Sequence, residues 1–151
     1  MKGEGRLFHY APARREAVVS IVRRILESQA DVRFAYLHGS FVTDGPFRDV
    51  DVAVYLDEPH AEALGLRAMD LNAAAEAALS RELDTSPPPV DVRVLNEAPL
   101  GFCYQTLRGG HLLMSRNEPF RIEWVVQIVA RYLDMKPLRD RALKEAMTAC
   151  R

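Results

Sequence analysis

Three short apolar runs in the first two thirds of the chain have the pattern of buried strands. The runs cover residues 33–38, 48–56 and 90–95, and each is rich in β-branched or aromatic residues and flanked by turn-forming residues. The Ala- and Leu-rich residues 60–82 separate the second run from the third. They predict a helix that connects the two strands.

Apolar residues also recur at helical spacing near both ends of the chain, which predicts amphipathic helices with buried apolar faces. Near the N-terminus these residues are Val18, Ile21, Val22, Ile25 and Leu26. Near the C-terminus they are Ile122, Val125, Val126, Val129 and Leu133. Pro137 is expected to open a last, separate helix. Trp124 and Ile128 lie off the C-terminal stripe, and either a partner interface or a crowded core would explain them.

The expected order is helix, strand, turn, strand, helix, strand, helix, short strand and two helices. It predicts an α+β fold with a small mixed β-sheet flanked by helices. With 151 residues, of which 48% are hydrophobic, the chain has enough apolar side chains for one core, and we expect a single domain over residues 1–151.

Charge and cysteine content narrow the functional classes. The chain has 20 Lys and Arg against 21 Asp and Glu, so a general attraction for long nucleic acid is not expected. The pairs Arg14-Arg15 and Arg23-Arg24 are interpreted as a solvated helix face. Two cysteines without metal-ligand spacing, no leader segment and no long apolar run predict a cytoplasmic protein without a membrane span.

The first candidate site is the turn after the first strand. Gly39 permits a backbone turn that a side chain would obstruct, and Ser40 suits the N-cap of a short helix. Free N–H groups and a hydroxyl in such a turn can hold phosphate oxygens. The alternative is an ordinary turn, because a Gly-Ser pair alone is common.

Two acids follow at the start of the second strand. Side chains alternate along a strand, so Asp49 and Asp51 share one face and Val50 and Val52 share the other. Paired carboxylates repel each other, and a divalent cation such as Mg²⁺ would compensate them. The alternative is a solvated strand end with two exposed acids.

A third acid, Asp91, stands between two valines in the third run. If that strand pairs beside the one that holds Asp51, three carboxylates converge on one rim of the sheet. Asp91 could then bind metal and help to deprotonate an attacking hydroxyl. The alternative is a structural ion pair with Arg93 on the same strand face.

Taken together, these motifs resemble the minimal nucleotidyltransferases (MNT) of the DNA polymerase beta superfamily. The resemblance rests on residues 38–41, on residues 47–55 and on residues 90–92. It extends to residues 107–113 and to residues 131–137, which resemble the segment after the third strand and the turn between the last two helices of that family.

The resemblance implies Mg²⁺-dependent transfer of a nucleoside monophosphate, with ATP as donor. It implies metal and catalytic roles for Asp49, Asp51 and Asp91, and nucleotide binding by Gly39 and Ser40. It also implies pairing with a HEPN-domain toxin, which the MNT protein would neutralise by adding AMP to a tyrosine; self-association stays open.

Three departures from the family pattern lie in the loop after Ser40. The link from Gly39-Ser40 to Asp49-Val50-Asp51 is shorter than in many members. Residues 43–45 are Thr-Asp-Gly where the family often has Arg-Gly, and Arg48 stands where a Ser often precedes the first Asp. Arg48 is therefore the candidate cation for the triphosphate. An antitoxin that acts by binding alone and a transferase for a small molecule remain as alternatives.

Overall fold

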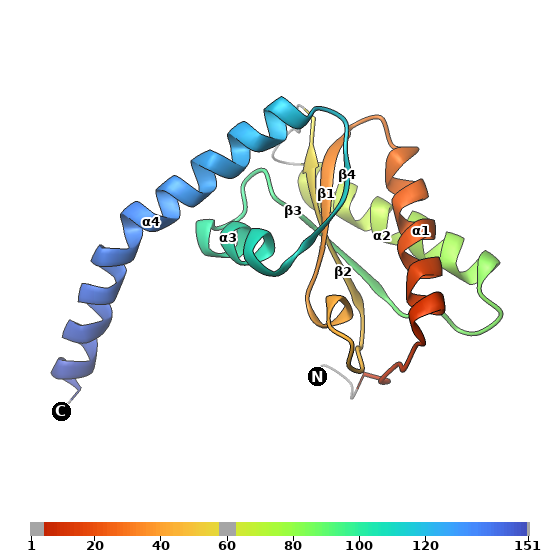
Figure 1. Ribbon diagram of the computed structural model, residues 1–151, viewed down its shortest axis with the longest axis horizontal. Helices are drawn as coiled ribbons and strands as arrows, with labels where there is room; N and C mark the ends of the chain where they lie inside the picture. The colour runs from red at the N-terminus through yellow and green to blue at the C-terminus, as the bar shows by residue number, and fades with distance from the viewer. Residues whose placement is uncertain (1–4, 58–62, 151) are drawn as a thin grey trace.

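The computed structural model describes residues 5–57 and 63–150, and its centre is a four-stranded mixed sheet with helices on both faces (Figure 1). The strands are β1 (Val32–His38), β2 (Val50–Leu56), β3 (Val90–Val94) and β4 (His111–Ser115), in the order β3-β2-β1-β4. β1 runs antiparallel to β2 and β4, whereas β2 and β3 are parallel. The predicted α+β fold with a small mixed sheet is confirmed.

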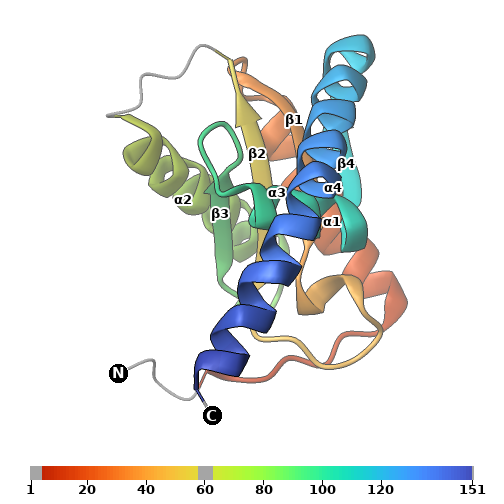
Figure 2. The ribbon, with the colours of Figure 1, turned by 90° about the vertical axis from the view of Figure 1, so that its left-hand side faces the viewer.

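Each face of the sheet is covered by two helices (Figure 2). Helices α1 (Pro12–Glu27) and α2 (Leu64–Glu82) pack on the face to which β2 contributes Val50 and Val52. Helix α3 (Leu100–Gly109) and the beginning of α4 (Glu118–Ala149) pack on the opposite face, around Ala53. The alternation of side chains along β2 thus assigns its odd-numbered residues to the α3 side.

Helix α2 provides the crossover that a parallel pair of strands requires. It also covers the outer edge of β3. The Glu76 carboxylate accepts a hydrogen bond from the backbone N–H of Val90 (2.9 Å), and the Asn72 amide oxygen accepts one from Val92 (2.6 Å). These bonds replace the strand neighbour that an edge strand lacks.

The expectation of two C-terminal helices separated at Pro137 is wrong. α4 is one helix of 32 residues with Pro137 inside it, and residues 131–137 form no turn. Proline removes one hydrogen bond from a helix and bends it, and α4 is visibly curved (Figure 1). The residues that follow Pro137 are mostly good helix formers, which lets the helix continue beyond it.

The apolar face of α4 that is buried is not the one expected. Ile128 is only 7% exposed, and Trp124 packs on Phe34 of β1 with ring centroids 5.1 Å apart. Val126, which belongs to the stripe expected in the core, is 60% exposed. The α3 side of the sheet is lined by aromatic rings, and Trp124 fits against them. Of the expected stripe, Ile122, Val126 and Leu133 are exposed, whereas Val125 and Val129 are half-buried. No helix among the described residues is long and apolar enough to span a membrane.

The packing of α4 predicts opposite outcomes for two truncations on the same helix. Ile128→Ala should lower the free energy of unfolding by roughly 2–5 kcal/mol, because it opens a cavity in the core. Val126→Ala, the matched control, should change it by less than about 0.5 kcal/mol. Urea denaturation measures both values. Equal losses for the two variants would contradict this assignment of the buried face.

Candidate active site

The turn after β1 is packed directly against a carboxylate of β2. Gly39 has φ = 75°, a conformation that favours glycine, and it precedes a short 3₁₀ helix, η1 (Ser40–Val42). Ser40 was expected to be the N-cap of this helix, but it is the first helical residue, and Gly39 is the N-cap. A Cβ on Gly39 would collide with Oδ2 of Asp51 and lie 3.0 Å from its Cγ. Both the backbone conformation and the space therefore require glycine.

The structure places the three predicted acids at the same end of the sheet. Asp51 pairs with His38 of β1 on one side and with Asp91 of β3 on the other. Asp49 immediately precedes β2 and is not part of it, because the strand begins at Val50. The sequence had predicted that Asp49 lies within this strand. All three acids are half-buried. The expectation that the third strand lies beside the second is confirmed.

This crowding changes the acidity of the central carboxyl. The pKa of Asp51 is raised to about 6, first by burial and then by the negative charges of Asp49 and Asp91. Arg93 acts in the opposite direction. The end of the sheet therefore carries more negative charge than its own cations compensate, which is the condition under which a bound cation is favourable.

Arg93 belongs to this site, although the sequence pattern suggested only an ion pair. Its Nε lies 3.4 Å from Oδ2 of Asp91, and its guanidinium lies over the Phe102 ring, 5.5 Å from the centroid. The proposed ion pair and the convergence of Asp91 with Asp51 therefore occur together. Residues two apart in a strand lie on the same face, so the spacing of Asp91 and Arg93 could have indicated that Arg93 belongs to the site.

His38 closes the site on the β1 side. Its ring packs edge-on against Phe102, with centroids 5.6 Å apart. Burial, followed by the charge of Arg93, lowers the pKa of His38. Its Nε2 is buried and has no hydrogen-bond partner among the described residues. His38 is thus a neutral side chain at the strand end, which agrees with the expected packing role.

Arg15 of α1 holds the loop that joins the Gly39-Ser40 turn to Asp49. Its guanidinium donates hydrogen bonds to the carbonyl oxygens of Phe41 (2.6 Å) and Gly45, and it lies over the ring of Phe47. Arg23 likewise donates to the carbonyl oxygen of Leu113 (2.8 Å). The interpretation as a solvated face is therefore wrong for Arg15 and Arg23, because their partners are backbone oxygens distant in sequence. Arg24 is exposed, as that interpretation expected.

The two remaining predicted residues, Ser40 and Arg48, are exposed beside the acids. The stem of Arg48 lies near Gly5, and the structure shows no hydrogen bond or ion pair between Arg48 and another described residue. Both side chains are accessible from solvent. Their role in nucleotide binding remains a prediction.

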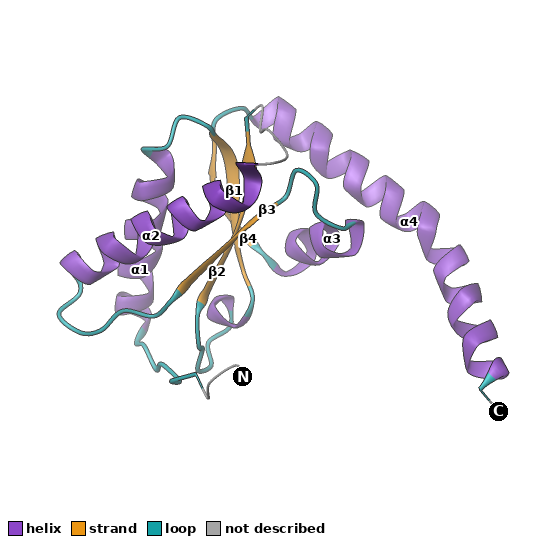
Figure 3. Ribbon diagram, turned by 180° about the vertical axis from the view of Figure 1, so that it is seen from behind, coloured by secondary structure: helices purple, strands orange, loops and turns teal. Residues whose placement is uncertain are grey.

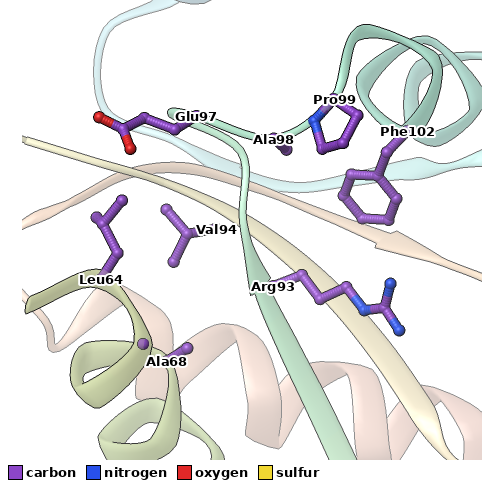
Figure 4. Close-up of a pocket in the computed structure, with 9 residues that line it drawn as sticks. Leu64, Ala68, Arg93, Val94, Glu97, Ala98, Pro99 and Phe102 are labelled. Carbon is purple, nitrogen blue, oxygen red and sulfur yellow. The ribbon is translucent and has the colours of Figure 1, made fainter. Parts of the chain in front are cut away.

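A pocket of about 430 Å³ opens beside Arg93, between β3, the start of α2 and the start of α3 (Figure 4). Its wall is mostly apolar, and Arg93 and Glu97 are its charged residues. The apolar side chains are Leu64, Ala68, Val94, Ala98, Pro99 and Phe102. Asp91 does not line this pocket, but Arg93 links the two, because its side chain both lines the pocket and contacts Asp91.

The acids fit Mg²⁺ that is shared with a nucleotide better than a metal held by protein alone. Among the described residues, no group of three or more Asp, Glu, His or Cys side chains is arranged to hold a metal ion. The carboxyl of Asp49 is close enough to Asp51 for its charge to raise the pKa of Asp51. Mg²⁺ is commonly bound by one or two carboxylates, and phosphate oxygens and water fill its other positions.

The comparisons with known proteins agree with this geometry. Residues 21–119, well over half of the chain, match the family described as Polymerase beta, Nucleotidyltransferase. The chain belongs to this nucleotidyltransferase family. No curated protein matches the sequence.

Solved structures of toxin-antitoxin systems share the fold of this nucleotidyltransferase. One is the tri-AMPylated HEPN toxin of Shewanella oneidensis in complex with MNT antitoxin: the matched chain is 18% identical, with a TM-score of 0.67 over 88% of this chain and 98% of that one. Another is a toxin-antitoxin structure with AMP-PNP, 19% identical, with a TM-score of 0.68 over 85% and 98%. At these identities the likeness establishes the fold.

The raised pKa of Asp51 predicts a pH-dependent stability. Because folded Asp51 binds its proton more tightly than the unfolded chain does, raising the pH from about 4 to about 6 should remove stability from the wild type. Asp51→Asn lacks this titration. With a chelator present, the melting temperature of the variant minus that of the wild type should therefore increase between about pH 4 and about pH 6. Above about pH 6 this difference should no longer change with pH. A difference that does not depend on pH would contradict the electrostatic account.

Proposed function

We propose that this nucleotidyltransferase uses Mg²⁺ and ATP to transfer AMP to a tyrosine hydroxyl of a partner HEPN toxin, and that it acts as the antitoxin. The observation that carries the proposal is the direct pairing of Asp51 with Asp91 beside the Gly39-Ser40 turn. This arrangement offers carboxylates and an accessible backbone turn at one place, as a metal-nucleotide complex requires.

Each residue has a role in the proposed reaction. The Gly39-Ser40 turn binds the triphosphate, and Arg48 adds a positive charge next to it. Asp49 and Asp51 hold Mg²⁺, which would neutralise phosphate charge during transfer. Asp91 completes the acidic set and accepts the phenol proton as the tyrosine oxygen bonds to the α-phosphorus; the bond from that phosphorus to pyrophosphate breaks.

The position of the pocket supports an aromatic acceptor. The pocket is lined by Arg93, whose guanidinium lies 3.4 Å from Asp91, the residue proposed to take the acceptor's proton. Phe102 and its apolar neighbours can contact a tyrosine ring, while Arg93 can stabilise the developing phenolate. The structure of the Shewanella oneidensis complex contains a tri-AMPylated HEPN toxin, which supports a protein acceptor of the same kind here.

Two alternatives make different predictions about the partner. An antitoxin that acts by binding alone would silence the toxin without modifying it. A transferase for a small molecule would leave the tyrosines of the toxin unmodified and the toxin active. The complete set of acids favours catalysis over binding alone, because their mutual repulsion has no evident use without a cation.

Incubation of this protein with its HEPN toxin partner, ATP and Mg²⁺ should add the mass of AMP to a tyrosine of that partner. Asp91→Asn should reduce the rate by at least about 100-fold, because it removes the proton acceptor, and should still bind both partner and ATP. Asp84→Asn, the same change at an exposed acid away from the site, should keep the wild-type rate.

Intact-mass spectrometry measures the modification, and toxin activity is measured in parallel. A partner that is silenced while remaining unmodified would replace the proposal with neutralisation by binding. Equal rates for Asp91→Asn and Asp84→Asn would remove Asp91 from the mechanism.

A further inference from the structure

The second half of α4 extends away from the rest of the molecule (Figure 3). Every described residue from Leu133 onwards is exposed. A projecting helix with polar residues all round would be unremarkable in water, but this one is rich in exposed apolar side chains. Those of α4 that are more than half exposed are Ile122, Val126, Leu133, Met135, Leu138, Leu143 and Met147.

Most of these side chains fall on one seam along the helix, which two charged residues interrupt near its centre. The seam positions are separated by alternate steps of four and three residues, which is the spacing of the a and d positions of a coiled coil. They are Ile122, Val126, Val129, Leu133, Lys136, Asp140, Leu143 and Met147. The seam lies beside the face of α4 that carries Trp124 and Ile128. Val129 is half-buried there, and every other seam position is exposed.

The last six seam positions are symmetric about position 138. A second copy of the helix can be placed alongside in the opposite direction, so that residue 138 of one copy lies beside residue 138 of the other. Val129 then faces Met147 of the second copy. Leu133 then faces Leu143. The two charged positions also meet: Lys136 of each copy faces Asp140 of the other, which places opposite charges in the two central layers.

The charges select this direction over the alternative. In a parallel pair in register, each seam residue would face its own copy, so Lys136 would meet Lys136 and Asp140 would meet Asp140. Like charges in a seam disfavour that arrangement, and a polar residue at a seam position is a known determinant of register. The complementary layers also favour a second copy of this chain as the partner. A two-fold axis between two identical helices places each of these six seam residues opposite its complement.

We propose that two copies of this chain associate through antiparallel pairing of the second halves of their α4 helices, along the seam from residue 129 to residue 147. This inference does not depend on the transferase activity.

Sedimentation velocity of the full chain over a range of concentrations tests the proposal. The wild type should form a species of twice the 17.0 kDa chain mass. Leu143→Glu should weaken the dimer by at least about tenfold. Leu138→Glu is the matched control, because Leu138 is 62% exposed and Leu143 is 60% exposed, but Leu138 lies on the other side of the helix. This variant should leave the dimer unchanged.

A charge exchange tests the direction of pairing. Lys136→Glu and Asp140→Lys should each dissociate the dimer, because each creates two layers of like charge. An equimolar mixture of these two variants should dimerise again, since every layer then joins opposite charges. A wild type that remains monomeric, or a dimer that Leu138→Glu and Leu143→Glu weaken equally, would overturn the proposal.

Discussion

The close approach of Gly39 to Asp51 is the constraint on which the site depends. β1 and β2 are antiparallel neighbours, and β1 ends where the acidic end of β2 begins. The chain can turn at that point only because residue 39 has no side chain and adopts a positive φ. As a result, the backbone that is proposed to bind phosphate and the carboxylate that is proposed to bind metal are in contact before any ligand arrives.

The rest of the fold maintains this contact and adds to it. Arg15 ties the loop after the turn to α1 through backbone carbonyl oxygens, and Phe47 anchors that loop among aromatic rings. The α2 crossover brings β3 alongside β2, so that Asp91 lies beside Asp51. Burial of Asp51, together with the negative charges of Asp49 and Asp91, raises its pKa, so Asp51 binds its proton unusually tightly. The fold thus positions these acids at the expense of some stability, which is common where a site is built for a charged ligand.

The strands and the three acids could be predicted because strand alternation is a local property. The contact between Gly39 and Asp51 could not, since it depends on register between strands. The buried face of α4 was assigned wrongly for a related reason: the helix has two apolar stripes, and only the aromatic surface of the sheet decides which one is covered. Arg15 was misinterpreted because its partners lie in a loop that the helical pattern does not reveal. Pro137 does not end α4, since the helix tolerates one lost hydrogen bond.

Binding of Mn²⁺, used in place of Mg²⁺, tests the central claim most directly. The free Mn²⁺ signal in electron paramagnetic resonance, titrated in the presence of AMP-PNP, gives the affinity of the metal-nucleotide complex without requiring a partner or a reaction. The account predicts that replacing both Asp49 and Asp51 by Asn weakens Mn²⁺ binding at least about tenfold while the chain stays folded by circular dichroism. Equal Mn²⁺ affinity in the wild type and in the folded double variant would contradict it.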